Sequence, residues 1–212
     1  MIKLFQTSSK WEQWWAKRQI DWTKEYLSTW NHPHRTLISA ALSRFNWMSL
    51  IEVGCGAGAN LANILQHFKG KQLGGIDVSP DAIAVAEKAF VGAIFKVGPV
   101  HDIMISDDST DVVLSDMCLI YYGPRKIGGA LKEIRRIARN RVIFCEFHHT
   151  SFWKRLKLRL TSGYYAYDYR KLLDKHGFHD IDIYKIPEAY WPGGNPQKTF
   201  GYIITAKVPR RK

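Results

Sequence analysis

Apolar positions along the chain follow two periods that alternate. Short runs rich in β-branched and aromatic residues are typical of buried strands, and the segments between them carry apolar residues at helical spacing. The pattern predicts strands near residues 50–53, 72–77, 93–97, 112–115, 141–147, 181–186 and 200–206. It predicts helices near residues 60–68, 80–90, 124–138 and 167–176, after a helical N-terminal segment over residues 9–42. This alternation favours one α/β domain whose parallel, doubly wound sheet binds ligands at the carboxyl ends of its strands.

The first predicted strand runs into Gly54, Gly56 and Gly58, three glycines at alternate positions. Glycine adopts positive φ and has no Cβ, so the backbone can turn sharply and lie close to a ligand. A dinucleotide site needs Gly-x-Gly-x-x-Gly, which this loop lacks, and Glu52 puts a carboxylate where a pyrophosphate would be repelled. Asp77 ends the second predicted strand, where an acid that binds the ribose hydroxyls is expected. These features indicate a nucleoside whose other end is cationic, and S-adenosylmethionine fits.

The glycine loop, Asp77 with the helix start at 78–80, and the acid-rich segment 107–111 resemble those of the class I S-adenosylmethionine-dependent methyltransferases, in particular small single-domain enzymes of the type 11 group. The resemblance is close over residues 49–147. It implies a Rossmann-like three-layer α/β/α sandwich with seven mostly parallel strands and an antiparallel C-terminal hairpin. It also implies S-adenosylmethionine as cofactor and S-adenosylhomocysteine as product. The implied cofactor contacts are Glu52, Gly54, Cys55, Gly56, Gly58, Asn60, Asp77, Val78, Asp116 and Met117.

The segment after the third predicted strand departs from the family pattern. Many relatives have Gly-Asp there, with the Asp reaching the adenine amino group, whereas this chain has Gly98-Pro99. Either His101 or Asp102 takes that role, or a backbone amide and carbonyl read the adenine edge.

Acceptor contacts are expected from the loops after the fourth and fifth strands and from the N-terminal segment. His148, His149 or His34 could remove a proton from an acceptor hydroxyl or ammonium group, and a solvated or hydrogen-bonded loop histidine is the alternative. Glu146 and His148 share a strand face, but no third metal ligand is evident and methyl transfer does not demand a metal, so none is expected. The other acceptor candidates are Tyr121, counted with the catalytic group, and Trp22, Tyr26, Arg35, Tyr122, Tyr167 and Trp191.

The N-terminal segment is rich in aromatic residues. Trp11, Trp15, Trp22 and Tyr26 recur at intervals of four and seven, which predicts a helix packed against the sheet. The resemblance implies that residues 1–45 form a lid over a core of residues 46–212. Arg35 would clamp a carboxylate or phosphate of the acceptor. An aromatic cage for a cationic acceptor is the alternative.

The net charge of +12 changes the picture of the partners. It favours an acidic one, which could be RNA, an anionic membrane surface or an anionic small acceptor. The aromatic, basic segment 152–160 could rest on an anionic surface, or form a cationic helix beside the active site. The three cysteines show no paired spacing, and the N-terminus has no long apolar run, so we expect a cytoplasmic protein with reduced thiols and neither a signal peptide nor a membrane span.

These observations favour methyl transfer to an oxygen or nitrogen of a small or medium, anionic metabolite. RNA or protein methylation is the second hypothesis, although the loop after the fourth strand lacks the Asn-Pro-Pro-Tyr and Pro-Cys motifs of enzymes that methylate bases. A non-catalytic protein that binds S-adenosylmethionine is the third. The sequence does not specify the oligomeric state.

Overall fold

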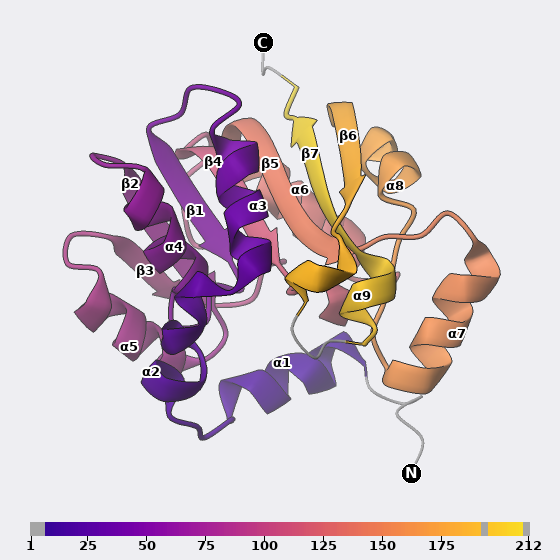
Figure 1. The fold of residues 1–212 in the computed structure, drawn as a ribbon, viewed down its shortest axis with the longest axis horizontal. Helices are drawn as coiled ribbons and strands as arrows, with labels where there is room; N and C mark the ends of the chain where they lie inside the picture. Colours follow the sequence, from indigo (N-terminus) through magenta and orange to yellow (C-terminus); the bar gives the residue numbers. More distant parts are fainter. Residues whose placement is uncertain (1–6, 192–194, 210–212) are drawn as a thin grey trace.

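One seven-stranded sheet forms the centre of the computed structural model, which describes residues 7–191 and 195–209. The strands are β1 (Ser49–Val53), β2 (Gln72–Asp77), β3 (Ile94–Val97), β4 (Thr110–Asp116), β5 (Ala138–Phe147), β6 (His179–Lys185) and β7 (Gly201–Lys207). They pair in the order β3-β2-β1-β4-β5-β7-β6 (Figure 1). β1 to β5 are parallel, and β7 runs antiparallel to both β5 and β6. The predicted Rossmann-like sheet with an antiparallel C-terminal pair is confirmed.

Helices cover both faces of this sheet. One face packs against α3 (Pro33–Leu42), α4 (Ala59–His67) and α5 (Pro80–Ala89), and the other against α6 (Ile127–Ile137) and α8 (Tyr169–Lys175). The remaining elements are η3 (Leu119–Tyr121), α7 (Phe152–Ser162), η4 (Glu188–Tyr190) and α9 (Gln197–Phe200). The three-layer sandwich follows from the strands, which are apolar on both sides.

The alternation of side chains along each strand decides which polar groups can meet. Leu50, Leu114 and Ile143 lie in the core under α3 and α4, whereas Val53, Val113 and Phe144 lie in the core under α6 and α8. Successive residues of a strand point to opposite faces. Glu52, Asp116 and Cys145 therefore belong to the α3–α4 face, and Glu146 and His148 to the α6–α8 face.

The predicted N-terminal helical segment is divided into four pieces. They are α1 (Ser8–Ala16), α2 (Trp22–Glu25), the 3-10 helix η2 (Leu27–Asn31) and α3. Asp21 accepts from the Lys24 amide at 2.9 Å and caps α2, and Pro33 occupies the first turn of α3, where its missing N–H costs nothing. α1 lies across the carboxyl ends of the strands (Figure 1).

The other boundaries follow the prediction with small differences. α6 begins at Ile127 because Pro124 lies in the preceding turn. Gly177, with φ +80°, ends α8 as expected. Segment 152–160 is helical and lies within α7. The helix is capped at its C-terminus by Gly163, with φ +79°. Across residues 7–191 and 195–209, none of the helices combines the length and the apolar character needed to cross a bilayer.

Candidate active site

A cavity of about 360 Å³ lies between the carboxyl ends of the strands and the N-terminal segment. Its volume is near the lower end of the roughly 300–1,000 Å³ typical of small-molecule sites. The expected site residues that line it are Trp22, Tyr26, His34, Arg35, Gly54, Gly56, Asp77, Val78, Asp116, Met117, Tyr121, Tyr122 and Trp191. It is also lined by Glu12, Trp15, His32, Gly98, Val100, Cys118, Ile120, Tyr164 and Gln197, which were not among the expected site residues.

The glycine loop has the backbone that its sequence predicts. Gly54, Gly56 and Gly58 all have positive φ, at +72°, +51° and +86°. A Cβ on Gly54 would lie 2.4 Å from the Cys118 sulfur, and one on Gly58 would lie 2.5 Å from the Phe90 ring. The loop therefore requires glycine for its conformation and for its close packing.

Asp77 joins the glycine loop to the start of α5. Its carboxylate accepts from the Gly56 amide at 2.8 Å and from the Ser79 amide at 2.9 Å. Burial raises the pKa of Asp77, and the backbone donors oppose that rise. The carboxylate lines the cavity beside Val78, at the end of β2 where a ribose acid was expected.

Asp116 is the centre of a polar network at the end of β4. Its Oδ2 accepts from His34 Nε2 at 3.1 Å, Arg35 Nη1 at 3.1 Å and Asn60 Nδ2 at 3.0 Å. Burial alone would raise the pKa of Asp116, but His34, followed by Arg35 and Asn60, holds it well below its usual range. Its Oδ1 is buried and has no hydrogen-bond partner.

Glu52 lies behind this network. Its Oε1 accepts from Asn60 Nδ2 at 2.6 Å, and its Oε2 is buried without a partner. Burial raises the pKa of Glu52 to about 8, with a further rise from the Asp116 charge. Glu52 and Asp116 thus each keep one buried carboxylate oxygen without a hydrogen-bond partner, and of the two residues only Asp116 lines the cavity.

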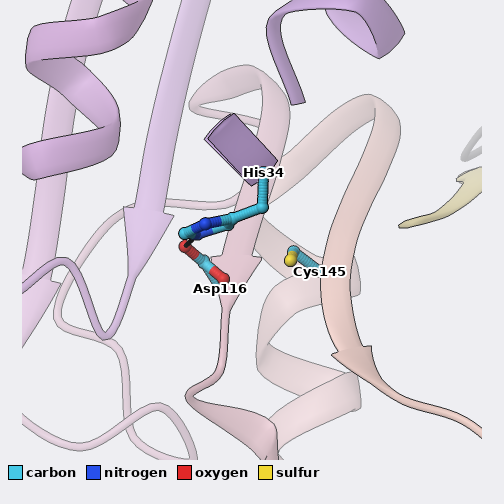
Figure 2. A group of neighbouring side chains, drawn as sticks. All are labelled: His34, Asp116 and Cys145. Carbon is cyan, nitrogen blue, oxygen red and sulfur yellow. Dashed lines mark hydrogen bonds and ion pairs between the residues drawn. The ribbon is translucent and has the colours of Figure 1, made fainter. Parts of the chain in front are cut away.

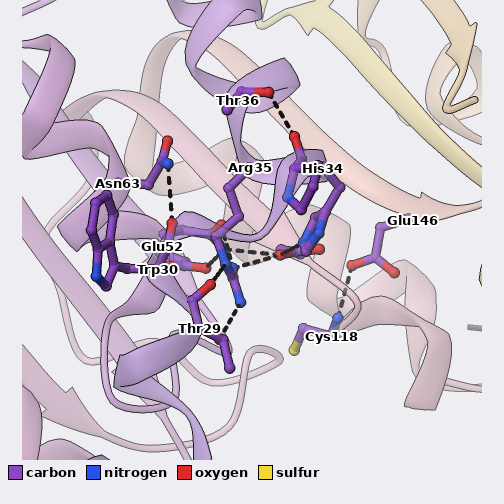
Figure 3. A network of polar contacts seen from close by, with 12 residues as sticks. Thr29, Trp30, His34, Arg35, Thr36, Glu52, Asn63, Cys118 and Glu146 are labelled. Atoms are coloured by element: carbon purple, nitrogen blue, oxygen red, sulfur yellow. Dashed lines mark hydrogen bonds and ion pairs between the residues drawn. The ribbon is translucent and has the colours of Figure 1, made fainter. Parts of the chain in front are cut away.

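Arg35 is a member of the network and not an open clamp. Its guanidinium donates to the carbonyl and hydroxyl oxygens of Thr29 (Figure 3). It also donates to Asn60 Oδ1 and to Asp116. These partners use four of its five N–H groups. Its charge compensates Asp116 before any ligand arrives.

His34, Asp116 and Cys145 place an imidazole nitrogen, a carboxylate oxygen and a thiol sulfur within 4.8 Å of one another (Figure 2). Such donors suit zinc. However, Arg35 already contacts the same Asp116 oxygen as His34, and burial raises the pKa of the Cys145 thiol well above its usual value. A metal would need the thiolate, so we assign His34 and Asp116 to the hydrogen-bond network and Cys145 to the apolar core beside it.

Glu146 shapes the loop after β4 from the neighbouring strand. Its carboxylate accepts from the Ser115 hydroxyl at 2.7 Å and from the backbone amides that begin η3, at Cys118, Leu119 and Ile120. The pKa of Glu146 is raised to about 8, because the effect of burial outweighs the opposing effect of these donors. Its oxygens are occupied, so it is not a ligand for a metal shared with His148.

His148, His149 and Tyr167 do not line the cavity. His148 directly follows β5 on the α6–α8 face, and its Nδ1 accepts from the Tyr169 amide at 3.1 Å, at the start of α8. His149 Nδ1 accepts from the Ser151 amide, and Tyr167 donates to the Tyr122 carbonyl at 2.5 Å. These side chains support the loops around the site, and among the three candidate histidines His34 alone lines the cavity.

The segment after β3, where an adenine contact was expected, reaches the cavity. Gly98 and Val100 line the cavity, and the Val100 amide donates to the Tyr122 hydroxyl at 3.1 Å. His101 instead faces Glu12, with 3.3 Å between His101 Nδ1 and a Glu12 carboxylate oxygen, and Asp102 is exposed. Neither His101 nor Asp102 lines the cavity, and the backbone alternative for the adenine edge stays a prediction.

The N-terminal segment covers one side of the cavity, across the carboxyl ends of the strands. The Gly123 amide donates to the Ser8 hydroxyl at 2.8 Å, and Lys126 Nζ lies 2.8 Å from Glu12. Trp15 packs within about 6 Å of Tyr121 and Tyr26, at 5.8 and 6.0 Å between ring centroids. Glu12 and Trp15 escaped prediction because nothing in the sequence indicates where the segment lies on the sheet.

A seven-stranded sheet of this order, with a glycine loop after β1 and an acid after β2, defines the class I S-adenosylmethionine-dependent methyltransferase fold. Residues 50–141 match the family model described as a methyltransferase domain. The chain thus has the class I methyltransferase fold and matches a methyltransferase-domain model over that segment, and no curated protein sequence matches it.

Three solved structures illustrate the shared fold. The Burkholderia thailandensis 1,6-didemethyltoxoflavin-N1-methyltransferase, solved with its 1,6-didemethyltoxoflavin ligand and S-adenosylhomocysteine, has a TM-score of 0.64 and 19% identity, covering 95% of this chain and 86% of that one. The magnesium protoporphyrin IX methyltransferase of Synechocystis PCC 6803, with bound S-adenosylmethionine, has a TM-score of 0.59 and 16% identity over 95% and 90%. The geranyl diphosphate C-methyltransferase of Streptomyces coelicolor A3(2) has a TM-score of 0.64 and 13% identity over 83% and 80%.

Proposed function

We propose that the protein transfers a methyl group from S-adenosylmethionine to an oxygen or nitrogen of a small or medium acceptor. The observation that carries this proposal is the cavity itself, which is lined by Gly54, Gly56, Asp77 and Asp116, with Glu52 buried behind Asn60. Asp77 would hold the ribose hydroxyls. Glu52 and Asp116 would favour the ammonium group, and the backbone at 98–100 would border the adenine.

The bound donor supplies an activated methyl group on a sulfonium centre. The protein then has to align the acceptor, exclude water and, for a protonated acceptor, remove a proton. The aromatic rings of Trp15, Tyr121 and Tyr164 would hold the acceptor and keep water out.

His34 is our candidate for the proton acceptor. Its Nε2 bonds to Asp116, which fixes the proton on that nitrogen, and its Nδ1 is buried without a partner. The ring is held against Trp191, with 4.4 Å between centroids. Nδ1 would take a proton from the acceptor once the side chains around it open a path to that nitrogen, with the imidazolium stabilised by Asp116.

The charges around the cavity bear on the acceptor. Among its described lining residues, Arg35 is the one lysine or arginine, and it is engaged in the network; Glu12, Asp77 and Asp116 are acidic. We therefore expect a neutral or cationic acceptor with an apolar or aromatic body, in place of the anionic one that the net charge favours. The positive charge of the chain lies elsewhere on the surface.

Calorimetry with S-adenosylhomocysteine tests the donor assignment. Asp77→Asn removes the charged acceptor of two ribose hydrogen bonds and should weaken binding roughly 10- to 100-fold. Asp81→Asn is the matched control, since Asp81 is exposed on α5 and bonds to Gln19; its affinity should equal that of the wild type. Equal affinity of the Asp77 variant and the wild type would refute the assignment.

Turnover is tested with radiolabelled S-adenosylmethionine against neutral, cationic and anionic small molecules, RNA and protein. Methylation of small neutral or cationic acceptors is the expected result. Donor binding without methylation of any acceptor class would favour the hypothesis of a non-catalytic protein that binds S-adenosylmethionine. Methylation confined to RNA or protein would favour the hypothesis of an RNA or protein methyltransferase.

A further inference from the structure

Helix α7 presents an unusual outward face. Its inward side buries Leu158, but Phe152, Trp153 and Leu160 are 59%, 74% and 45% exposed. At 100° per residue, Phe152, Leu156, Leu160 and Trp153 form one continuous stripe that faces away from the body. Exposed apolar side chains gathered on one stripe of a helix mark a contact surface rather than scattered surface residues.

A basic stripe runs beside the apolar one. Lys157 and Lys154 follow Trp153 around the helix and are exposed, and α7 contains no acidic residue. The two arginines of α7 serve the fold instead. Arg155 donates to the carbonyl oxygens of His149 and Thr150, and Arg159 stacks on Tyr165 at 4.2 Å.

The neighbourhood of α7 extends this positive charge. Burial lowers the pKa of His149, and Lys154, Arg155 and Lys185 lower it further. Lys185 therefore lies close enough to the start of α7 to contribute to the same field. An anionic surface would contact the side chains of Lys154 and Lys157, while the apolar stripe of α7 inserts into that surface.

The underside of α7 connects this surface to the cavity. Leu158 packs in one cluster with Ile120, Phe147 and Phe200. Ile120 also lines the cavity, as does Tyr164, which follows the end of α7. A partner bound to the outward face of α7 would lie next to the acceptor side of the site.

We propose that α7 is an interfacial helix that docks the protein on an anionic phospholipid surface. Phe152, Trp153 and Leu160 enter the headgroup region, and Lys154 and Lys157 contact the lipid phosphates. The aliphatic part of the stripe favours a bilayer over RNA, because leucine side chains neither stack on bases nor read them. The net charge of +12 adds long-range attraction to an acidic membrane.

Vesicle co-sedimentation tests this proposal, with phosphatidylcholine vesicles alone and with roughly 30% phosphatidylserine. The wild type should bind the acidic vesicles at low salt, bind neutral vesicles at least tenfold more weakly, and dissociate as salt rises. The double variants Trp153→Ala/Leu160→Ala and Lys154→Gln/Lys157→Gln should each lose about tenfold or more.

Two matched controls keep the test specific. Lys88→Gln/Lys96→Gln removes two exposed lysines at the opposite edge of the sheet, and Met104→Ala removes an 83% exposed apolar side chain elsewhere. Both should bind like the wild type, and all variants should unfold at similar temperatures. Failure to bind acidic vesicles, or equal losses in controls and α7 variants, would overturn the proposal; RNA binding that needs Trp153 without vesicle binding would replace it.

Discussion

Glu52→Gln tests whether the carboxyl beneath the glycine loop is protonated at neutral pH in the ligand-free protein. Glu52 is buried, accepts from Asn60, and has its pKa raised by burial from 4.5 to about 8. Glutamine keeps the size of the side chain and an acceptor oxygen for Asn60. The substitution therefore removes the ionisation and little else.

The size of the effect follows from the pKa shift. At ~1.4 kcal/mol per unit, a change from 4.5 to about 8 corresponds to ~5 kcal/mol, as an order of magnitude. A group with a raised folded-state pKa stabilises the protein fully below its unfolded pKa and loses that contribution as pH rises through the folded value. The wild type should lose this stability between pH 4.5 and about 8, while the variant should not.

Urea unfolding followed by tryptophan fluorescence, at about pH 5, 7 and 9, measures this difference. We expect the variant to be the more stable protein at the highest pH and the two to converge at the lowest. Glu133→Gln is the contrasting control, because its hydrogen bond with Arg136 lowers the pKa of Glu133 and its ionised form is stabilising. Wild type and Glu52 variant with parallel pH profiles would refute the reasoning.

Three further predictions concern stability and the N-terminal segment. Gly58→Ala should cost ~3 kcal/mol of unfolding free energy, because its φ is positive and a Cβ would clash with the Phe90 ring. Gly70→Ala, with φ +70° but nothing within 4 Å of a Cβ, should cost only ~1–2 kcal/mol, and equal costs in thermal unfolding would mean that the Phe90 clash contributes nothing. Asp111→Asn should lose ~1–2 kcal/mol of unfolding free energy at neutral pH, because the Asp111 carboxylate accepts from two backbone amides. The pKa of Asp111 is lowered, so the difference from the wild type should vanish as acid protonates the carboxylate; a urea-unfolding difference that persists below about pH 3 would argue against this. Glu12→Gln should speed hydrogen exchange of the α1 amides about three- to tenfold, and unchanged exchange would mean that α1 is held by packing alone.

The sequence predicted the sheet well because each strand is bounded by its own local signals. β2 begins and ends where the apolar run and Asp77 place it, and β1 ends where the glycines begin. The position of the residues proposed for the donor could be predicted for the same reason, and Gly54, Gly56, Asp77, Val78, Asp116 and Met117 line the cavity, whereas Glu52, Cys55, Gly58 and Asn60 do not. These residues lie within a few positions of strand ends, and the chain direction of a parallel sheet brings those ends together.

The acceptor half was not predictable to the same degree. The rule that ligands meet the carboxyl ends of strands favoured His148 and His149, but β5 continues past the site while pairing with β7, so that His148 faces α8. Arg35 resembled an exposed anion clamp because the sequence does not show Asp116, its partner from a distant strand. Long-range pairing of this kind depends on how the N-terminal segment packs, which no local pattern encodes.

The contacts that hold α1 over the cavity have a kinetic consequence. The Gly123–Ser8 hydrogen bond and the Lys126–Glu12 ion pair fasten the helix directly above the space assigned to the donor. If S-adenosylhomocysteine leaves on the side that α1 covers, each turnover includes a step in which these contacts break and re-form. Where methyl transfer is the faster event, kcat reports the opening of this helix, and solvent viscosity rather than acceptor reactivity sets the rate.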